Sequence, residues 1–510
     1  MENRLFILLL SFSISLASYA QDSQYVKLDA YFEKALTDWE VPGMAIGIIK
    51  DNNIWMAKGY GVRNSESKGE VNAQTIFPIA SNTKAFTSAA LASLVDKKLI
   101  SWDDRVVDYI SYFQLYDPYV TQMMTIRDLL CHRSGLATFS GDLLWFNSNY
   151  SSEEVIKRAR FLKPTYDFRT KFGYSNIMFI TAGEIIPIIS EKSWDSYLSE
   201  NFFTPLGMSR TFTSISQLAE VDNVASPHND IKGEVLPISY QNWDNIGGAG
   251  AINSCVDDML RWLKLQLSEG TLDNHQYFSK QSAWEMWSPQ TIQAVSPYSK
   301  NRFPTIHFKA YGLGWGMFDY HGVKVISHSG GYDGMISYSC FVPEKGLAFV
   351  ILTNKNSSLY YPLSYKILDE FIAGIDKDWS IEILDLIKKN EEYDEQQKKK
   401  MNAERILGTK PTLDLKSYSG IYSSELYGDA EIKLVNKKLQ VVLLPSPLFT
   451  GELAHWQYNT FTVKMNNFPS LPAGKVNFYL GMDGTIEEMK IDIPNPDFDF
   501  TELQFLKVKL

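Results

Sequence analysis

The sequence predicts an α+β protein in which an antiparallel sheet carries an inserted helical region and a small all-β, barrel-like domain follows. Three patterns support this. Short apolar runs at residues 44–49 and 54–60 precede a long helical stretch, and further strand-like runs follow it from residue 311. Short alternating runs then recur from residue 418 to the end. A length of 510 residues fits two to four domains.

The first twenty residues have the pattern of a secretory signal. Arg4 precedes an apolar run that extends to Leu16, and Ser18-Tyr19-Ala20 places small residues at a cleavage site. We expect cleavage after Ala20 and export to the periplasm or the medium, with an uncleaved anchor as the alternative. No later stretch reaches membrane-spanning length, so no membrane span is expected after cleavage.

The mature chain begins with an amphipathic helix at about residues 25–40, which Pro42-Gly43 ends. A hairpin follows, with strands at 44–49 and 54–60 around the turn Asp51-Asn52-Asn53. A helix then begins near Ser81 and continues to Val95 with an apolar stripe that packs in a core.

Residues 100–300 are expected to be mostly helical, with many loops. The loop at 139–150 is rich in aromatic residues, and Gly247-Gly248-Ala249-Gly250-Ala251 would let backbones approach closely. Strands are expected at 311–316, 323–328, 335–342 and 347–352, with a helix at 359–374. These elements complete a main domain that spans residues 21–375.

Residues 376–411 form a charged helical linker, which the composition favours as a solvated helix. The C-terminal domain spans 412–510, as a small barrel or sandwich. Its expected strands are at 418–422, 430–435, 439–444, 460–464, 476–480, 486–491 and 503–508.

Charge and cysteine content exclude some classes of function. The net charge is −10 and no basic stripe is visible, so nucleic acid is not the expected partner. Cys131, Cys255 and Cys340 cannot all pair, and each is expected to be buried. The seven histidines lack zinc-type spacing, so no metal and no cofactor is predicted. The oligomeric state is left open.

Ser81 and Lys84 stand three residues apart at the start of a helix, so they share a helix face. A serine needs a base to act as a nucleophile, and a desolvated lysine can lose its proton near neutral pH. Alone, the Ser-x-x-Lys pattern is weak evidence for a catalytic site, because the same spacing also occurs at the start of helices whose lysine is simply solvated.

Two other segments supply what a serine–lysine site lacks. Tyr174 can shuttle protons if its neighbours let it ionise below its ordinary pKa, and Asn176 can orient a substrate. The alternative is a turn tyrosine with its hydroxyl in water. The strand that contains His328, Gly330 and Gly331 ends in small residues, so a substrate backbone can lie against it. His328 either binds the substrate or is satisfied by a carbonyl.

These segments together resemble a known family. Ser81-Asn82-Thr83-Lys84, Tyr174-Ser175-Asn176 and His328-Ser329-Gly330 match, in order, the three motifs of the serine β-lactamase and penicillin-binding-protein superfamily, and best its class C-like branch. Residues 125–136, 248–259 and 311–315 resemble secondary signatures of that branch. The resemblance covers about residues 25–375, and the C-terminal domain resembles the lipocalin-like domain often appended to the branch.

The resemblance implies a β-lactamase/transpeptidase-like fold and a role for each motif residue. Ser81 would be the acylated nucleophile, Lys84 would hold or relay its proton, and Tyr174 would be the general base. Asn176, His328 and Gly330 would contact the substrate. The oxyanion hole would consist of the N–H groups of Ser81 and Gly331, at a helix N-terminus that favours negative charge.

The third motif departs from the family pattern, because His328 stands where β-lactamases and transpeptidases usually carry lysine. A neutral histidine offers no permanent cation to a substrate carboxylate. Cys131, where the branch usually has threonine or serine, is expected to have a structural effect only.

The leading hypothesis is therefore an exported serine hydrolase that acts through an acyl-enzyme on an ester, an amide or a D-amino-acid peptide, with at most weak β-lactamase activity. The alternatives are a penicillin-binding covalent sensor that deacylates slowly, a D-alanyl-D-alanine carboxypeptidase, and a catalytically silent scaffold. The aromatic residues Phe139, Trp145 and Phe146 are expected to wall the cleft, which would suit an apolar substrate group.

Overall fold

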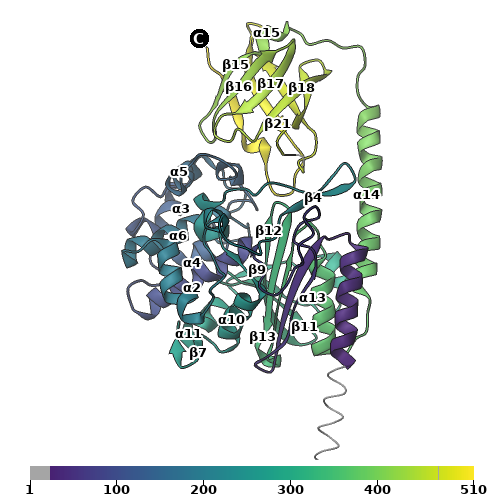
Figure 1. The fold of residues 1–510 in the computed structure, drawn as a ribbon. Helices are drawn as coiled ribbons and strands as arrows, with labels where there is room; N and C mark the ends of the chain where they lie inside the picture. The colour runs from purple at the N-terminus through teal and green to yellow at the C-terminus, as the bar shows by residue number, and fades with distance from the viewer. Residues whose placement is uncertain (1–22, 469, 510) are drawn as a thin grey trace, which may run out of the picture.

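The structure is a computed structural model that describes residues 23–468 and 470–509. The signal expected at residues 1–20 lies outside the described residues. A sheet with its helices forms one body, and a β-barrel forms a second body above it in Figure 1. The long helix α14 (Trp379–Ala403) runs along one side and leads from the first body to the second.

The main sheet is antiparallel and has eight strands in the order β2-β1-β14-β13-β12-β11-β10-β9. The N-terminal hairpin therefore joins the strands from the end of the domain, as predicted, with Met44 opposite Thr353. The strands are β1 (Gly43–Lys50), β2 (Asn53–Gly61), β9 (Thr291–Gln293), β10 (Lys309–Tyr311), β11 (Gly316–Tyr320), β12 (Val323–Tyr332), β13 (Met335–Val342) and β14 (Leu347–Thr353).

The prediction of one strand at residues 311–316 is wrong. Only Tyr311 ends one strand and Gly316 begins the next, and the residues between them form the connection. Gly314 has φ +80°, and its N–H donates to the Leu130 carbonyl outside the sheet. The alternation of glycine with large residues resembles the pattern of a strand, but the positive φ of Gly314 is incompatible with a continuous strand. The sequence also missed β9 and β11.

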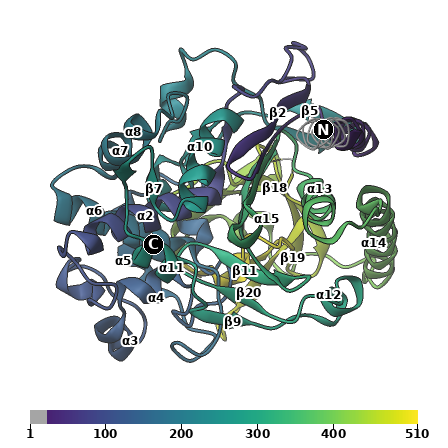
Figure 2. The ribbon, with the colours of Figure 1, turned by 90° about the horizontal axis from the view of Figure 1, so that it is seen from below.

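Helices cover both faces of the sheet (Figure 2). On one face, α10 (Val256–Leu267) packs against β1, β13 and β14, and α2 (Thr83–Asp96) lies beyond it with the inserted region. On the other face, α13, the start of α14 and the helix at residues 23–38 form a second core around Phe32, Leu363 and Trp379. The helix predicted at 359–374 ends as a wider π-turn, Asp369–Ala373.

In the inserted region helices are the main regular structure, with many loops between them, as predicted. Its helices, with the two that flank the sheet, are α2 (Thr83–Asp96), α3 (Pro118–Met123), α4 (Ile126–Leu130), α5 (Ser152–Arg158), α6 (Asn176–Ser190), α7 (Trp194–Leu198), α8 (Thr204–Leu206), α9 (Gly247–Gly250), α10 (Val256–Leu267), α11 (Lys280–Met286), α12 (Pro297–Arg302) and α13 (Tyr360–Leu368). Small strands at its rim pair as β3 (Phe77–Pro78) with β6 (Asn253–Ser254), β4 (His228–Ile231) with β5 (Glu234–Pro237) and β7 (Thr271–Leu272) with β8 (His275–Gln276).

The C-terminal domain is a closed eight-stranded barrel rather than a sandwich. After the short helix α15 (Leu415–Tyr418), its strands are β15 (Gly420–Ser424), β16 (Gly428–Val435), β17 (Lys438–Leu443), β18 (Thr450–Gln457), β19 (Thr460–Met465), β20 (Gly474–Leu480), β21 (Ile486–Asp492) and β22 (Gln504–Lys507). Closure removes free sheet edges. The sequence missed β18 but predicted the other seven.

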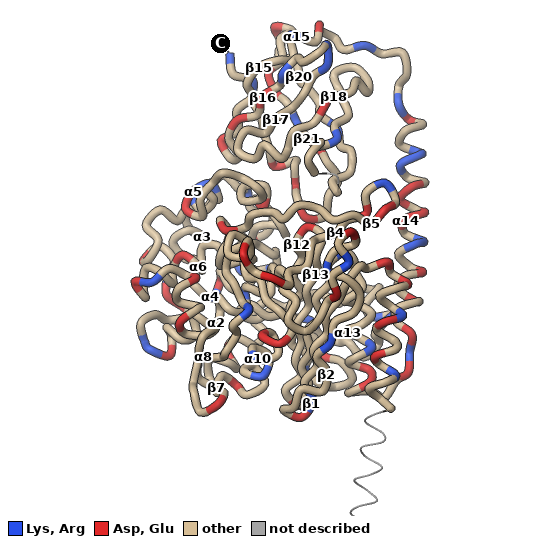
Figure 3. The backbone as a smooth tube through the Cα atoms, viewed as in Figure 1, with Lys and Arg blue, Asp and Glu red and all other residues tan. Residues whose placement is uncertain are grey.

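The linker helix α14 is solvated along its second half, as its composition indicates. From Glu391 to Ala403 each side chain is exposed, and acidic and basic residues follow one another along the helix in Figure 3. The three cysteines are buried and unpaired. Within residues 23–468 and 470–509, no helix combines the length and the apolar character that a membrane crossing needs.

The barrel also contacts the inserted region directly. The Tyr150 hydroxyl donates to the Tyr427 carbonyl at 2.6 Å, and the Asn149 N–H donates to the Pro445 carbonyl at 2.9 Å. The Phe146 ring packs against aromatic rings of the barrel, with 4.5 Å between its centre and that of Phe498. The barrel is therefore seated on the aromatic loop that sequence analysis placed at the cleft.

Candidate active site

Ser81 lies in a short 3-10 turn, Ala80–Asn82, that leads directly into α2. Ala80 has φ +45°, a conformation that costs a non-glycine residue energy and needs support from its surroundings. That support comes from β13, where the Ser337 hydroxyl donates to the Ile79 carbonyl at 2.6 Å and accepts from Asn82 Nδ2 at 2.8 Å. The turn is thus fastened to the sheet on both sides of Ser81.

Lys84 is completely buried, and its Nζ has three neighbours at hydrogen-bond distance. Nζ lies 3.0 Å from Ser81 Oγ, 2.7 Å from Asn176 Oδ1 and 2.9 Å from the Ala249 carbonyl oxygen. Burial lowers the pKa of Lys84 to about 7. A neutral amine donates two N–H groups to the two carbonyls and turns its lone pair to the serine hydroxyl, which is the arrangement of a base.

The small-residue segment at 247–251 makes this geometry possible. A Cβ at Gly248 would lie 2.8 Å from the Phe179 carbonyl oxygen, so only glycine lets α9 approach α6 this closely. The Thr87 hydroxyl then donates to the Gly248 carbonyl at 2.7 Å, which holds the next carbonyl, of Ala249, against Lys84. The close backbone approach predicted here is confirmed.

Asn176 begins α6, and its side chain is fixed by a residue that sequence analysis missed. Its Nδ2 donates to Asp142 Oδ2 at 2.6 Å, and Asp142 Oδ1 accepts from Trp145 Nε1 at 2.9 Å. The amide can therefore present only its oxygen to Lys84. Burial raises the pKa of Asp142 to about 7. The available signal was that Asp142 is the one acidic residue in the aromatic loop at residues 139–150.

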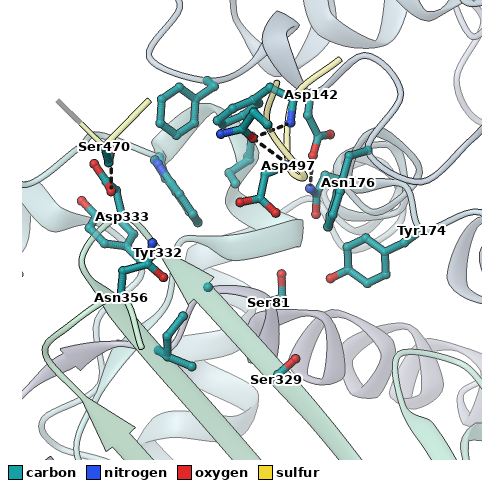
Figure 4. Close-up of a pocket in the computed structure, with 18 of the residues that line it drawn as sticks. Ser81, Asp142, Tyr174, Asn176, Ser329, Tyr332, Asp333, Asn356, Ser470 and Asp497 are labelled. Atoms are coloured by element: carbon teal, nitrogen blue, oxygen red, sulfur yellow. Dashed lines mark hydrogen bonds between the residues drawn. The ribbon is translucent and has the colours of Figure 1, made fainter. Parts of the chain in front are cut away.

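Tyr174 precedes α6, and its hydroxyl points toward Ser81 (Figure 4). Its ring lies 4.8 Å from Lys84 Nζ and 4.3 Å from the ring of the buried His132. Burial raises the pKa of Tyr174 above its ordinary value, although the hydrogen bond with Ser81 opposes this. Tyr174 therefore does not meet the condition for ionising below its ordinary pKa, because desolvation of the phenolate outweighs its polar contacts.

His328 lies in β12, where both of its ring nitrogens already have partners in the protein. Nε2 is 2.7 Å from the Tyr311 hydroxyl, and Nδ1 is 2.6 Å from the Ser329 carbonyl oxygen. Burial, with the nearby Lys84, lowers the pKa of His328 to about 3. The histidine is therefore neutral, and the carbonyl-satisfied alternative describes it, although it also lines the cavity beside Ser81.

The end of β12 is an open edge beside the nucleophile. Pairing with β11 ends at Ser327, opposite Gly316, so the following residues have no strand neighbour on that side. A Cβ at Gly330 would lie 2.1 Å from the Ile79 carbonyl oxygen and 3.0 Å from the Ser81 nitrogen, whereas one at Gly331 would meet only Ile336 Cδ1, at 3.8 Å. Gly330 therefore packs on the nucleophile turn, and Gly331 lines the cavity.

Ser81, Tyr174, Asn176, His328 and Gly331 all line one cavity of about 570 Å³. The aromatic residues predicted to wall the cleft do so, since Phe139, Trp145 and Phe146 line the same cavity. Lys84 sits behind Ser81, and Gly330 beneath it. The structure thus brings together every residue that the three motifs predicted. Among residues 23–468 and 470–509, no group of three or more His, Cys, Asp or Glu residues is placed to hold a metal ion.

The far wall of the cavity comes from the barrel, which sequence analysis did not foresee. Phe468, Ser470, Asn495, Asp497 and Phe498 line the cavity together with Ser81. Figure 4 shows Ser470 against Asp333 on one side and the Asp497 carboxylate directed into the cavity. The candidate active-site cleft therefore lies between the two domains, and the barrel is part of it.

Comparison with known proteins agrees with this geometry. The profile of the family described as Beta-lactamase matches residues 28–366, which is about two thirds of the chain and contains all three motifs. The chain belongs to the beta-lactamase family. A second profile, described as a domain of unknown function (DUF3471), matches residues 404–507, which contain the barrel of this beta-lactamase-family protein.

Curated relatives of this family member include a protein named as a hydrolase. The chain is 28% identical to "Unguisins hydrolase ungD" of Aspergillus violaceofuscus over 454 residues, with 81% of this chain and 78% of the relative covered. It is 26% identical to "Protein flp" of Staphylococcus aureus (strain MRSA252) over 352 residues, with 67% of this chain and 64% of the relative covered.

Among solved structures, the octameric penicillin-binding protein homologue from Pyrococcus abyssi matches with a TM-score of 0.62. The identity is 21%, and the match covers 95% of this chain and all of the other. At this identity the match concerns the fold alone, and it places the protein in the β-lactamase/transpeptidase-like architecture that the motifs implied.

Proposed function

We propose that the protein is an exported serine hydrolase that forms an acyl-enzyme on Ser81. The observation that carries the proposal is the arrangement around Lys84 Nζ. Two carbonyl groups take its N–H donors, burial lowers its pKa to about 7, and its remaining position faces Ser81 Oγ at 3.0 Å. Export is supported by the signal pattern of residues 1–20.

Acylation would proceed in balanced steps. Lys84 accepts the Ser81 proton while Oγ bonds to the substrate carbonyl carbon, and the oxyanion is held by the N–H groups of Ser81 and Gly331. The bond to the leaving group then breaks, and Tyr174 supplies the proton that this group needs. The Lys84 ammonium returns a proton to Tyr174, so the enzyme ends acylated with its phenol and amine neutral.

Deacylation would use the same groups in reverse. Water gives a proton to the site as its oxygen bonds to the acyl carbon, and the Ser81 oxygen leaves as a hydroxyl. Because Tyr174 is held protonated, Lys84 is the group better suited to accept the proton from water. Asn176, held by Asp142, keeps the amine in place for both half-reactions.

The substrate would be an ester, an amide or a D-amino-acid peptide. Support for a hydrolase comes from the relative named unguisins hydrolase. Neutral His328 gives a carboxylate-bearing β-lactam no cation, so efficient β-lactamase activity is not expected, and a D-alanyl-D-alanine carboxypeptidase is disfavoured for the same reason.

One alternative keeps a specific observation in its favour. A tyrosine held protonated is a poor base for activating water, so an acyl-enzyme here could persist. The protein would then be a covalent penicillin-binding sensor. Stoichiometric labelling of Ser81 by a fluorescent penicillin without turnover would select this alternative.

The test compares the purified protein with its Ser81→Ala variant on p-nitrophenyl esters, nitrocefin and D-Ala-D-Ala peptides. We expect ester hydrolysis that the variant has lost and an acyl adduct on Ser81 by intact mass spectrometry. Equal rates for the two proteins on every substrate would overturn the mechanism.

A further inference from the structure

The barrel places a loop in the catalytic cleft and holds it there. The loop follows β21 and contains Asn495, Asp497 and Phe498. Asn495 Oδ1 accepts from the Asp497 N–H at 2.7 Å and from the Phe498 N–H at 3.0 Å, which forms a tight turn. The Phe498 ring packs on Phe146 of the other domain, so the turn is anchored on both sides.

Just beyond the loop, Glu502 makes a second anchor. Its Oε2 accepts from the Gly141 N–H at 2.8 Å, and its Oε1 accepts from the Ser140 hydroxyl. Both partners belong to the aromatic loop that lines the cavity. The backbone on either side of Asp497 is therefore held by contacts before and after it.

The lining of the cavity contains acidic side chains but no lysine or arginine among the described residues. The acidic residues are Asp142, Asp333 and Asp497. His328 is neutral, and Lys84 is behind Ser81 with its N–H groups already used. A substrate anion would meet no free cation among the described residues of this cavity.

The three carboxylates differ in whether the protein satisfies them. Asp142 accepts from Asn176 and Trp145, and Asp333 accepts from Asn229 Nδ2 at 2.8 Å and from Ser470. The Asp497 carboxylate forms neither a hydrogen bond nor an ion pair with any residue in 23–468 or 470–509, and it points into the cavity in Figure 4. The Asp497 side chain is exposed, and desolvation by the atoms around it raises the pKa of its carboxyl above the ordinary value.

The walls of the cavity also suit a cation. Phe139, Trp243, Tyr332, Phe468 and Phe498 line the cavity, and the faces of aromatic rings attract ammonium groups. An ammonium group in the cavity would be paired by Asp497 and flanked by these rings, and the nearby Lys84 is shielded behind Ser81.

We propose that Asp497, supplied by the barrel, makes the site selective for acyl donors that carry an ammonium group, the chemistry of a peptide or ester with a free amino group. The proposal rests on the proposed Ser81 hydrolase function and deepens it. It also gives the barrel a role in catalysis, because the barrel then contributes a specificity determinant rather than a separate binding function.

The experiment uses three p-nitrophenyl esters with acyl chains of similar length: 6-aminohexanoyl, hexanoyl and adipoyl, which carry an ammonium, no charge and a carboxylate. Each is assayed with the full-length wild type and with the full-length variants Ser81→Ala, Asp497→Asn and Asp492→Asn. Asp492 is exposed at the end of β21 and does not line the cavity, so its variant controls for net charge and for the fold of the barrel.

For the wild type we expect kcat/KM to fall in the order ammonium, neutral, carboxylate. Asp497→Asn should lower the ratio of ammonium to neutral ester by about threefold to fivefold, because it removes one solvent-exposed ion pair. It should change the neutral ester little, and Asp492→Asn should retain the wild-type ratio.

The outcomes separate the two proposals. If the wild type hydrolyses the neutral ester and Ser81→Ala does not, the hydrolase function is supported, whatever the kcat/KM ratios between charged and neutral esters are. If the wild type and Asp497→Asn then have the same ratio of kcat/KM for the ammonium ester to kcat/KM for the neutral ester, the selectivity proposal is overturned and the hydrolase proposal stands. If no ester is hydrolysed through Ser81, both proposals fall together.

Discussion

The Glu502 carboxylate of the barrel accepts the N–H of Gly141 at 2.8 Å, one residue before the buried Asp142. Asp142 in turn holds Asn176, whose oxygen lies 2.7 Å from Lys84 Nζ. These polar contacts, together with the peptide link between Gly141 and Asp142, connect the barrel to the amine that faces Ser81. The charge on Glu502 raises the pKa of Asp142, so the barrel also acts on the site electrostatically.

Glu502→Gln should shift the acid limb of the pH profile of kcat/KM to higher pH. Without the Glu502 charge the pKa of Asp142 falls, more of Asp142 is ionised, and the pKa of Lys84 rises toward its ordinary value. Ester hydrolysis measured from pH 5 to pH 9 tests this. Glu452→Gln, which alters an exposed ion pair with Lys438 on the outer side of the barrel, is the matched control and should leave the limb unmoved.

Asp142→Asn should move the same limb in the opposite direction, to lower pH. Asp142 raises the pKa of Lys84, so removing its charge lets burial depress that pKa further. The rate at the optimum should also drop by about a hundredfold, because an amide at position 142 cannot accept from both Asn176 and Trp145 and the amine loses its positioning. A lowered rate with an unmoved or raised limb would show a structural effect only.

The candidate catalytic residues could be predicted from sequence because each sits in a short local pattern. Ser81 and Lys84 share one helical turn, and Asn176 follows Tyr174 at a helix start, so neighbours in sequence are neighbours in space. The hairpin, the sheet and most barrel strands followed from periodicity for the same reason. Local patterns fail at Gly314, whose positive φ turns a strand-like sequence into a connection.

The residues that sequence analysis missed act across long separations. Glu502 and Gly141 are 361 positions apart, and Asn176 and Asp142 are 34 apart, with no periodic pattern to relate them. Asp497 lies in a short loop whose sequence resembles any polar turn. Its place opposite Ser81 depends on how the two domains dock, which rests on contacts such as Phe146 with Phe498. The resistance of Tyr174 to ionisation likewise reflects burial, a tertiary property.

Lys84 should make stability depend on pH in a defined window. Its pKa is about 7 in the folded protein and near 10.5 when exposed, so between these values the unfolded chain binds more protons and a rise in pH favours the folded state. The free energy of unfolding of the wild type should therefore increase relative to Lys84→Met, on the order of 3 kcal/mol between pH 7 and pH 9.5.

Urea denaturation of both proteins across pH 6–9.5 measures this difference. In Lys84→Met the pKa of Asp142 loses the lowering effect of the ammonium, which adds to the difference in the same direction near pH 7. Below pH 7 the contribution of Lys84 itself should be constant. A gap between the two proteins that stays flat up to pH 9.5 would contradict the lowered pKa of Lys84.

Gly330 and Gly331 are neighbours in β12, yet substitution by alanine should destabilise the fold at Gly330 and leave its stability unchanged at Gly331. At Gly330 a Cβ would lie 2.1 Å from the Ile79 carbonyl oxygen and 3.0 Å from the Ser81 nitrogen, and neither backbone atom can move without displacing the nucleophile turn. Gly330→Ala should cost about 2–4 kcal/mol of stability and about a hundredfold in kcat/KM. At Gly331 a Cβ would meet only Ile336 Cδ1 at 3.8 Å, so Gly331→Ala should unfold at the wild-type urea concentration. Equal denaturation midpoints for the two variants would mean that Gly330 does not pack against the Ser81 turn as closely as the structure places it.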